Sequence, residues 1–175
     1  NNTGKFYVKG NAALGNIGND PANKPSKVIF DGTGTQTITH NSGTQPIYLG
    51  VTSTEVGETN SPVVVLAGAG TGGFRNFGDL NVNSNATLDV AQQLINRNSA
   101  GGSINLAAGS IMKIGRNSGG IGTSNFPSNY STYNFNATST VEYNGALAQT
   151  VHHLPLYGNI TLSNTANKNP TGNIT

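Results

Sequence analysis

Short runs of alternating apolar and polar residues recur along this chain at regular distances. Leu80-Asn-Val82 is matched by Ile104-Asn-Leu106, and Leu88-Asp-Val90 is matched by Met112-Lys-Ile114, both at a spacing of 24 residues. In each run two aliphatic side chains flank a polar one, which is typical of a strand with one buried face. These runs predict short strands that return once per coil of a stacked architecture.

A longer repeat is superimposed on the short one. The segment 28–38 returns as 141–151, and the run that begins at Phe77 returns from Tyr157. We expect the recurring glutamines to form a side-chain hydrogen bond that closes a corner, or a ladder with a neighbour. The residues predicted to define the repeat in this structural way are Gly32, Gln36, Gly145, Gln149, Tyr157 and Phe77.

The spacings favour an all-β fold. Residues 95–99 are echoed by residues 114–118, and we expect these turns at equivalent corners of adjacent coils. Coils of about 19–24 residues with short strands predict a parallel β-helix, or β-solenoid. A β-sandwich with hairpin turns is the alternative.

The two periods also suggest how the chain is organised. Residues 1–40 are interpreted as the C-terminal part of one repeat unit, and residues 41–175 as the following unit and the start of the next. The units form one continuous solenoid, which we expect to be a fragment of a longer chain.

The composition suits a chain that turns often. It has 26 Asn, 24 Gly and 20 Thr, and only 9% of its residues are charged, against roughly 25% in an average soluble domain. The net charge of +2 and the regular alternation disfavour intrinsic disorder. Without a basic run or a long apolar run, we expect no nucleic-acid partner and no membrane span in this segment. The lack of cysteine excludes disulfides and thiolate chemistry.

Three segments carry a resemblance to a known family. Ser139–Gly145, Ala148–Val151 and Tyr157–Leu162 resemble the recurring unit of large repetitive cell-surface proteins of Bacteroidetes bacteria. The first copy has Asp31 where this pattern usually has Asn. The resemblance implies export by the type IX secretion system, an extracellular location on the bacterial cell surface, and a role in gliding or attachment.

Candidate chemistry is sparse. Asp31 and Glu142 would be the carboxylates of a carbohydrate-active β-helix, but nothing in the pattern demands a pair held about 5–10 Å apart. His40, His152 and His153 lack a recurring acidic partner and are expected to be polar residues at strand ends. We therefore predict no catalytic residue, no cofactor and no metal site.

An aromatic cluster is the remaining candidate site. Phe126, Tyr130 and Tyr133 lie close together in the sequence, and exposed rings of this kind can stack on sugars. The alternative is that the cluster plugs the core.

The sequence thus predicts a structural and adhesive segment of a long extracellular repeat protein, a stalk or surface-attachment filament. Its partners would be neighbouring repeats of the same chain, and surface glycans or other cells. The alternative is a polysaccharide-binding or carbohydrate-active β-helix module.

Overall fold

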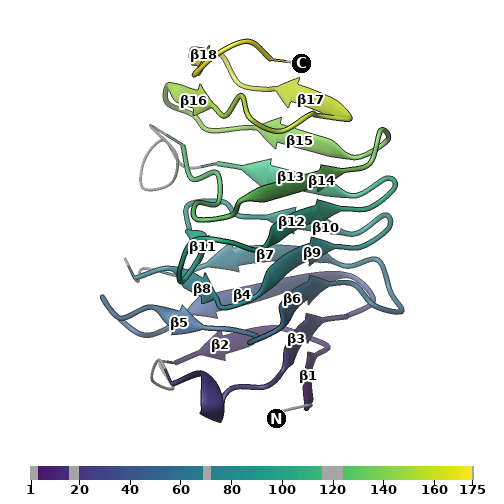
Figure 1. Ribbon diagram of the computed structural model, residues 1–175, viewed down its shortest axis with the longest axis vertical. Helices are drawn as coiled ribbons and strands as arrows, with labels where there is room; N and C mark the ends of the chain where they lie inside the picture. Colours follow the sequence, from purple (N-terminus) through teal and green to yellow (C-terminus); the bar gives the residue numbers. More distant parts are fainter. Residues whose placement is uncertain (1–3, 16–19, 69–71, 116–123, 175) are drawn as a thin grey trace.

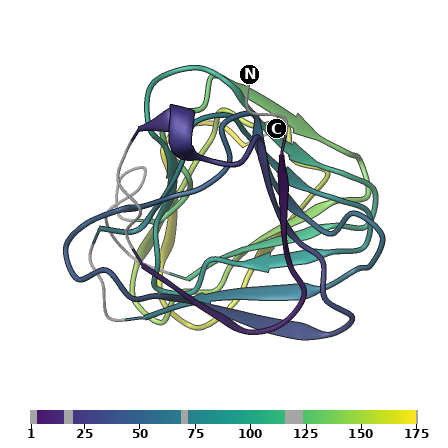
Figure 2. The same ribbon diagram turned by 90° about the horizontal axis from the view of Figure 1, so that it is seen from below.

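The chain winds into a parallel β-solenoid with three sides (Figures 1 and 2). The computed structural model describes residues 4–15, 20–68, 72–115 and 124–174. Within these residues every strand pairs in parallel with a strand of a neighbouring coil. The predicted solenoid is therefore confirmed, and the β-sandwich alternative is wrong.

The strands stack along the long axis of the molecule (Figure 1). Sheet A has the order β1 (Lys5–Val8), β3 (Lys27–Phe30), β6 (Ser53–Val56), β9 (Asp79–Val82), β12 (Ser103–Leu106) and β14 (Thr132–Phe135). Sheet B has the order β2 (Ala12–Leu14), β4 (Thr35–His40), β7 (Val63–Ala67), β10 (Thr87–Asp89), β13 (Ile111–Ile114), β15 (Thr140–Tyr143) and β17 (Asn159–Leu162).

The third side is built from shorter strands. Sheet C contains β5 (Ile47–Tyr48), β8 (Phe74–Asn76) and β11 (Ile95–Arg97), and further along the axis sheet D contains β16 (Gln149–Val151) and β18 (Lys168–Pro170). A single turn of 3-10 helix, η1 (Pro21–Asn23), precedes β3. The described residues include no helix with the length and apolarity needed to cross a membrane.

Aliphatic side chains from all three sides fill the interior. The 24-residue echo is confirmed as the coil repeat, because Leu80 pairs with Ile104 and Leu88 pairs with Met112. Each of these four side chains is fully buried. The inward positions thus stack in columns along the axis, so that each coil covers the core of the next.

The coil length varies more than the sequence suggested. One coil runs from Ile114 to its pairing partner Tyr143, whereas the next is much shorter and runs from Tyr143 to its partner Leu162. The expectation that the echo of residues 95–99 marks adjacent coils is wrong, because Ile95 lies in sheet C and Ile114 in sheet B. Residues 116–118, the rest of that motif, lie outside the described part of the chain.

The long repeat is rotated by one side of the solenoid. In the first copy, β3 lies in sheet A and leads to β4 in sheet B. In the second copy, the equivalent strand β15 lies in sheet B and leads to β16 on the third side. The runs that begin at Phe77 and Tyr157 are displaced by one side in the same way, since β9 lies in sheet A and β17 lies in sheet B.

Residues 41–75 lie between segment 28–38 and the run that begins at Phe77, whose equivalents in the second copy follow each other closely. These intervening residues contribute one additional coil. The chain turns five corners from β4 to β9 but only two from β16 to β17, and the difference of three corners is one full turn. A whole-turn insertion leaves every later strand on the same side. Pairing between β4 and β7 continues across the repeat boundary at residue 40, so sheet B has no break there.

The recurring glutamines close equivalent corners. Gln36 Oε1 accepts a hydrogen bond from the Gly32 N–H at 2.7 Å, and its Nε2 donates to the Val8 carbonyl at 2.9 Å. In the second copy Gln149 accepts from Gly145 at 2.7 Å and donates to the Ile114 carbonyl at 2.9 Å. Each glutamine therefore fixes its own corner and ties it to the preceding coil.

The glycine of each motif makes room for its glutamine. A Cβ atom at Gly32 would lie 2.7 Å from Gln36 Cδ, and one at Gly145 would lie 2.5 Å from Gln149 Cδ. The two residue types therefore recur together because they share one space.

Phe77 and Tyr157, which begin the two echoed runs, have different surroundings. Phe77 stacks on Tyr48 with ring centroids 5.4 Å apart. The hydroxyls of Tyr157 and Tyr143 lie 3.0 Å apart. Their common feature is the glycine that follows, because a Cβ at Gly78 or Gly158 would overlap a backbone oxygen of the preceding coil.

Candidate functional site

The outer surface of sheet A carries a ladder of carboxamides. Asn81, Asn105 and Asn134 occupy the same register position on β9, β12 and β14, and Glu55 holds that position on β6. Each is the outward residue between two inward ones, so the period of the strand places all four on one face. We call these four residues the amide ladder.

Hydrogen bonds run through the ladder in one direction. Asn134 Nδ2 donates to Asn105 Oδ1 at 2.7 Å, and Asn105 Nδ2 donates to Asn81 Oδ1 at 2.5 Å. Asn81 Nδ2 then donates to Glu55 Oε1 at 3.0 Å. Because the Glu55 carboxylate can only accept hydrogen bonds, it fixes the orientation of the three amides of the ladder.

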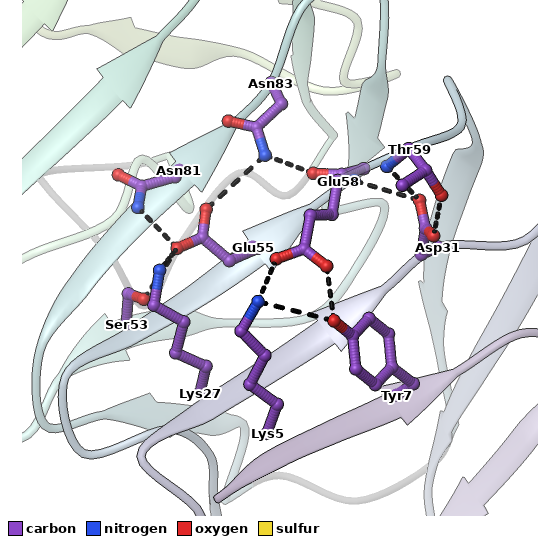
Figure 3. Close-up of polar contacts among 11 residues, drawn as sticks. Lys5, Tyr7, Lys27, Asp31, Ser53, Glu55, Glu58, Thr59, Asn81 and Asn83 are labelled. Atoms are coloured by element: carbon purple, nitrogen blue, oxygen red, sulfur yellow. Dashed lines mark hydrogen bonds and ion pairs between the residues drawn. The ribbon is translucent and has the colours of Figure 1, made fainter. Parts of the chain in front are cut away.

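The ladder ends in a paired charge. Lys27 Nζ lies 3.1 Å from Glu55 Oε1, and the Ser53 hydroxyl donates to the same oxygen at 2.7 Å (Figure 3). Asn83 adds a long contact of 3.5 Å to Glu55 Oε2 and donates to the Gly57 carbonyl. The Oε1 atom of this buried carboxylate therefore has three partners within the protein, from Lys27, Ser53 and Asn81.

A second ion pair lies beside this end. Lys5 Nζ is 2.6 Å from Glu58 Oε1, and the Tyr7 hydroxyl donates to Glu58 Oε2 (Figure 3). The hydrogen bond to Glu58 raises the pKa of Lys5, and that from Lys5 lowers the pKa of Glu58. Solvent screens such pairs, so we assign this one little stabilising energy.

Asp31 caps the turn of the following coil. Its Oδ1 accepts hydrogen bonds from the backbone N–H groups of Glu58 and Thr59, and its Oδ2 accepts one from the Thr59 hydroxyl at 2.6 Å (Figure 3). The Asn60 N–H also donates to Oδ1, and the three backbone bonds measure 2.9–3.0 Å. Burial alone would raise the pKa of Asp31, but these four donors outweigh it and hold the pKa far below its usual range. The carboxylate is 1% exposed and serves the fold.

A shallow, open groove of about 380 Å³ lies at the other end of the ladder. It crosses the ends of β9, β12 and β14, and its asparagines are Asn83, Asn105, Asn134 and Asn136; its other lining residues are Val82, Leu106, Ala107 and Phe135. None of these described lining residues is charged. The rim of the groove therefore offers neutral hydrogen-bonding groups.

Several of these groups remain unused within the described part of the chain. Asn134 uses one N–H in the ladder, which leaves its other N–H and its carbonyl oxygen. Asn136 accepts from the Thr138 N–H and hydroxyl, both at 3.0 Å, and keeps both amide hydrogens. Asn83 keeps its carbonyl oxygen. Donors and acceptors are thus both presented at the groove.

The aromatic residues predicted to contact glycans are mostly buried. Phe126 is 0% exposed and Tyr130 6% exposed, so neither ring can stack on a sugar. Tyr133 is half-buried and packs against Phe126, with ring centroids 5.9 Å apart. The structure therefore favours the core-plug alternative for Phe126 and Tyr130.

The core environment of this cluster is partly polar. The Tyr130 hydroxyl accepts a hydrogen bond from Asn76 Nδ2 at 2.8 Å, and burial raises the pKa of Tyr130. His152 packs on Phe126 with centroids 4.8 Å apart. Burial lowers the pKa of His152 to about 4, and the neighbouring His153 adds to that shift.

Asp31 and Glu142, the candidate catalytic carboxylates, do not meet. Asp31 directly follows β3, whereas Glu142 lies on β15, beyond β6, β9, β12 and β14 along the axis. Four strand spacings place them roughly 20 Å apart, beyond the range of a glycosidase pair. Glu142 instead pairs with Lys113 at 3.3 Å.

The histidines are also separated. His40 is buried on β4 against Phe74, while His152 and His153 follow β16. Within the described ranges no three histidine or carboxylate side chains gather closely enough to hold a metal ion.

The amide ladder was not anticipated from the sequence. Asn81 and Asn105 are the central residues of two matched runs, but Glu55 and Asn134 lie outside that motif, and the spacings that join the four are 26, 24 and 29 residues. The signal in the sequence was a polar residue between two aliphatic ones at Asn81 and Asn105, whereas Asn134 lies between two aromatic residues and Glu55 follows a threonine. Comparisons with protein-family models, with curated proteins and with solved structures found no match.

Proposed function

We propose that this chain is a stiff structural and adhesive segment of a long extracellular repeat protein displayed on a bacterial surface. The observation that carries the proposal is the unbroken parallel stacking of sheet B from β2 to β17. Such a stack grows along one axis by adding coils, and each coil contacts only its neighbours. That geometry suits a stalk.

Two features support stiffness. Backbone hydrogen bonds between strands run along the axis, so bending the rod must strain many of them together. The inward side chains form one continuous core that spans every coil described. Flexibility would need local hinges of exposed, weakly packed backbone. The strands of sheet A from β3 to β12 and those of sheet B from β4 to β15 are instead paired on both sides with strands of the neighbouring coils.

Weak adhesion fits the surface chemistry. The outward surface of sheet A carries the neutral amides of Asn81, Asn105 and Asn134. Its lysines, Lys5 and Lys27, are paired with carboxylates of the same chain. Each contact to a partner would be weak, but a repeated rod presents many such contacts at once. The resemblance of Ser139–Gly145 and its following segments to bacterial surface repeats supports display outside the cell.

Length measurement tests the proposal. In a fusion series, Thr140 would be followed directly by Val28 of the next copy, because residues 141 and 28 are equivalent in the repeat. Each added unit leads from β3 to the equivalent strand β15, which lies four coils further along the axis and on the next side. At one strand spacing per coil, the particle should lengthen by roughly 20 Å per unit. Electron microscopy of two, four and six units would show straight rods, and coiled or beaded particles would refute the stalk.

The location requires a separate experiment. Antibodies raised against the folded chain should label intact cells of the source organism without permeabilisation. Labelling only after permeabilisation would contradict surface display while leaving the rod itself untouched.

A polysaccharide-binding module is the second candidate function. The groove beside Asn134 favours it over a carbohydrate-active enzyme, because the carboxylates considered for catalysis lie far apart. The two candidates are compatible, since a stiff rod can also carry binding sites.

A further inference from the structure

We infer that the groove bordered by Asn83, Asn105, Asn134 and Asn136 binds a neutral polysaccharide chain. The inference deepens the proposed adhesive function and rests on it for its biological setting. Its physical basis is independent of that function, and consists of the fixed amides and the uncharged lining.

The amides at the groove are preorganised. Asn105 is held by three hydrogen bonds, to Asn81, Ser103 and Asn134. Asn136 is held by the Thr138 N–H and hydroxyl. Because these orientations exist before a ligand arrives, binding costs little side-chain entropy.

The available groups match hydroxyl chemistry. A sugar hydroxyl both donates and accepts, and the groove offers both functions: amide N–H groups on Asn134 and Asn136, and carbonyl oxygens on Asn83 and Asn134. These side chains come from successive coils, which are spaced regularly along the axis. A polymer with regularly spaced hydroxyls would meet them repeatedly, whereas a single sugar would not.

An acidic polysaccharide fits less well. The lysines nearest to the ladder on sheet A, Lys5 and Lys27, are already paired with Glu58 and Glu55. Among the described residues that line the groove, an anionic chain would meet no cation, and Asn83 on its rim already contacts the Glu55 carboxylate. The geometry therefore favours a neutral chain.

A protein partner also fits less well. Protein interfaces usually centre on a buried aromatic or arginine anchor. The exposed large apolar side chains of the described residues, such as Leu147, Leu154 and Leu156, lie elsewhere and do not line the groove.

The volume of the groove, about 380 Å³, is within the usual range for small-ligand sites, but the groove is open rather than enclosed.

Affinity electrophoresis is the direct test. The whole chain would be run through gels that contain a neutral polymer, which is hydroxyethyl cellulose, xylan, mannan or laminarin. Parallel gels would contain an acidic polymer, which is alginate or polygalacturonate. We expect retardation by at least one neutral polymer and none by the acidic ones. Retardation by acidic polymers alone, or by no polymer, would overturn the inference.

Two substitutions at one position locate the site. Asn134→Ala removes donor and acceptor, and Asn134→Asp keeps the shape but cannot donate to Asn105. Both should weaken binding about tenfold, in line with the loss of one or two hydrogen bonds. Asn134 is exposed, so thermal unfolding should confirm that both variants fold.

Asn169→Ala is the matched control. Asn169 is an exposed asparagine on β18, on the third side of the solenoid. Its replacement should leave retardation unchanged. An equal loss in the control, or unchanged binding in both Asn134 variants, would refute this groove as the site.

The rod-length series separates the two proposals. Straight rods that bind no neutral polymer would refute the groove and leave the stalk intact. Flexible particles that bind through Asn134 would refute the stalk and leave the groove intact.

Discussion

Gln36 and Gln149 make the same pair of hydrogen bonds at two corners that lie on different sides of the solenoid. Each accepts from a glycine N–H four residues earlier and donates to the last carbonyl of a strand in the preceding coil. The first corner joins sheets A and B, and the second joins sheet B to the third side. One local unit therefore serves any side of the solenoid.

This corner predicts paired effects of two glycine substitutions. Gly32→Ala should lower the free energy of unfolding by about 1–3 kcal/mol, because the added Cβ displaces Gln36 and leaves buried polar groups unpaired. Gly34→Ala is the control, since a Cβ there has no heavy atom within 4 Å. Urea denaturation of both variants would measure the difference, and equal stabilities would contradict the shared-space explanation.

Removing Gln36 itself should have a similar cost. Gln36→Ala leaves the buried Gly32 N–H without its acceptor and removes the bonds to the Val8 and Gly10 carbonyls, although the Val8 carbonyl keeps the hydrogen bond from the Asp31 N–H. We expect this loss to cost about 1–3 kcal/mol. The double variant with Gly32→Ala should cost much less than the sum of the two single changes, because both remove the same bonds. Strict additivity in denaturation experiments would show that the two residues act separately.

Asp31 should make stability depend on acid pH. Its folded pKa lies far below that of the unfolded chain, so its stabilising contribution is complete above the unfolded pKa of about 4 and is lost as the pH falls below it. Asp31→Asn should therefore lower stability at pH 7 and flatten the pH dependence between about 4 and 2. Glu142→Gln, which alters a partly exposed ion pair, should change stability by less than about 1 kcal/mol.

His152 should act in a higher pH range. Its folded pKa of about 4 lies below the unfolded value near 6.5, so the unfolded chain takes up the proton first as the pH falls. Stability is then fully present above about pH 6.5 and decreases by on the order of 2–3 kcal/mol as the pH falls to 4. His152→Gln should remove this slope in urea titrations at several pH values, whereas an unchanged slope would assign it to another group.

Two adjacent valines test the inside–outside pattern of sheet B. Val64 is fully buried between Gln36 and Leu88, while Val65 points outward on the same strand. Val64→Ala should cost about 1.5–3 kcal/mol in lost burial and a new cavity, and Val65→Ala less than about 1 kcal/mol. Thermal or urea unfolding with the reverse order would mean that the register of β7 is wrong.

The strands and corners could be predicted from the sequence because their signals are local. The alternation at Leu80-Asn-Val82 reflects one strand, and the Gly32–Gln36 pair reflects contacts made within a single corner. Such units keep their residues wherever they occur, so the short and the long repeat indicated a stacked β fold correctly.

The assignment of motifs to sides needed the tertiary structure. The motif at Ile95 returns at Ile114, yet Ile114 lies on another side, because the coil there is 24 residues long and a spacing of 19 falls short of a full turn. A spacing in the sequence counts residues, whereas the side depends on how many corners the chain has turned.

The sequence by itself determined that the chain is a β-solenoid with glycine–glutamine corners and few charges. Only the tertiary structure decided that Phe126 and Tyr130 are buried, and that Asn81, Asn105 and Asn134 form one hydrogen-bonded ladder. The physical reason is that burial and ladders depend on register between coils. Register is set by the stacking of the whole core, and no single strand contains that information.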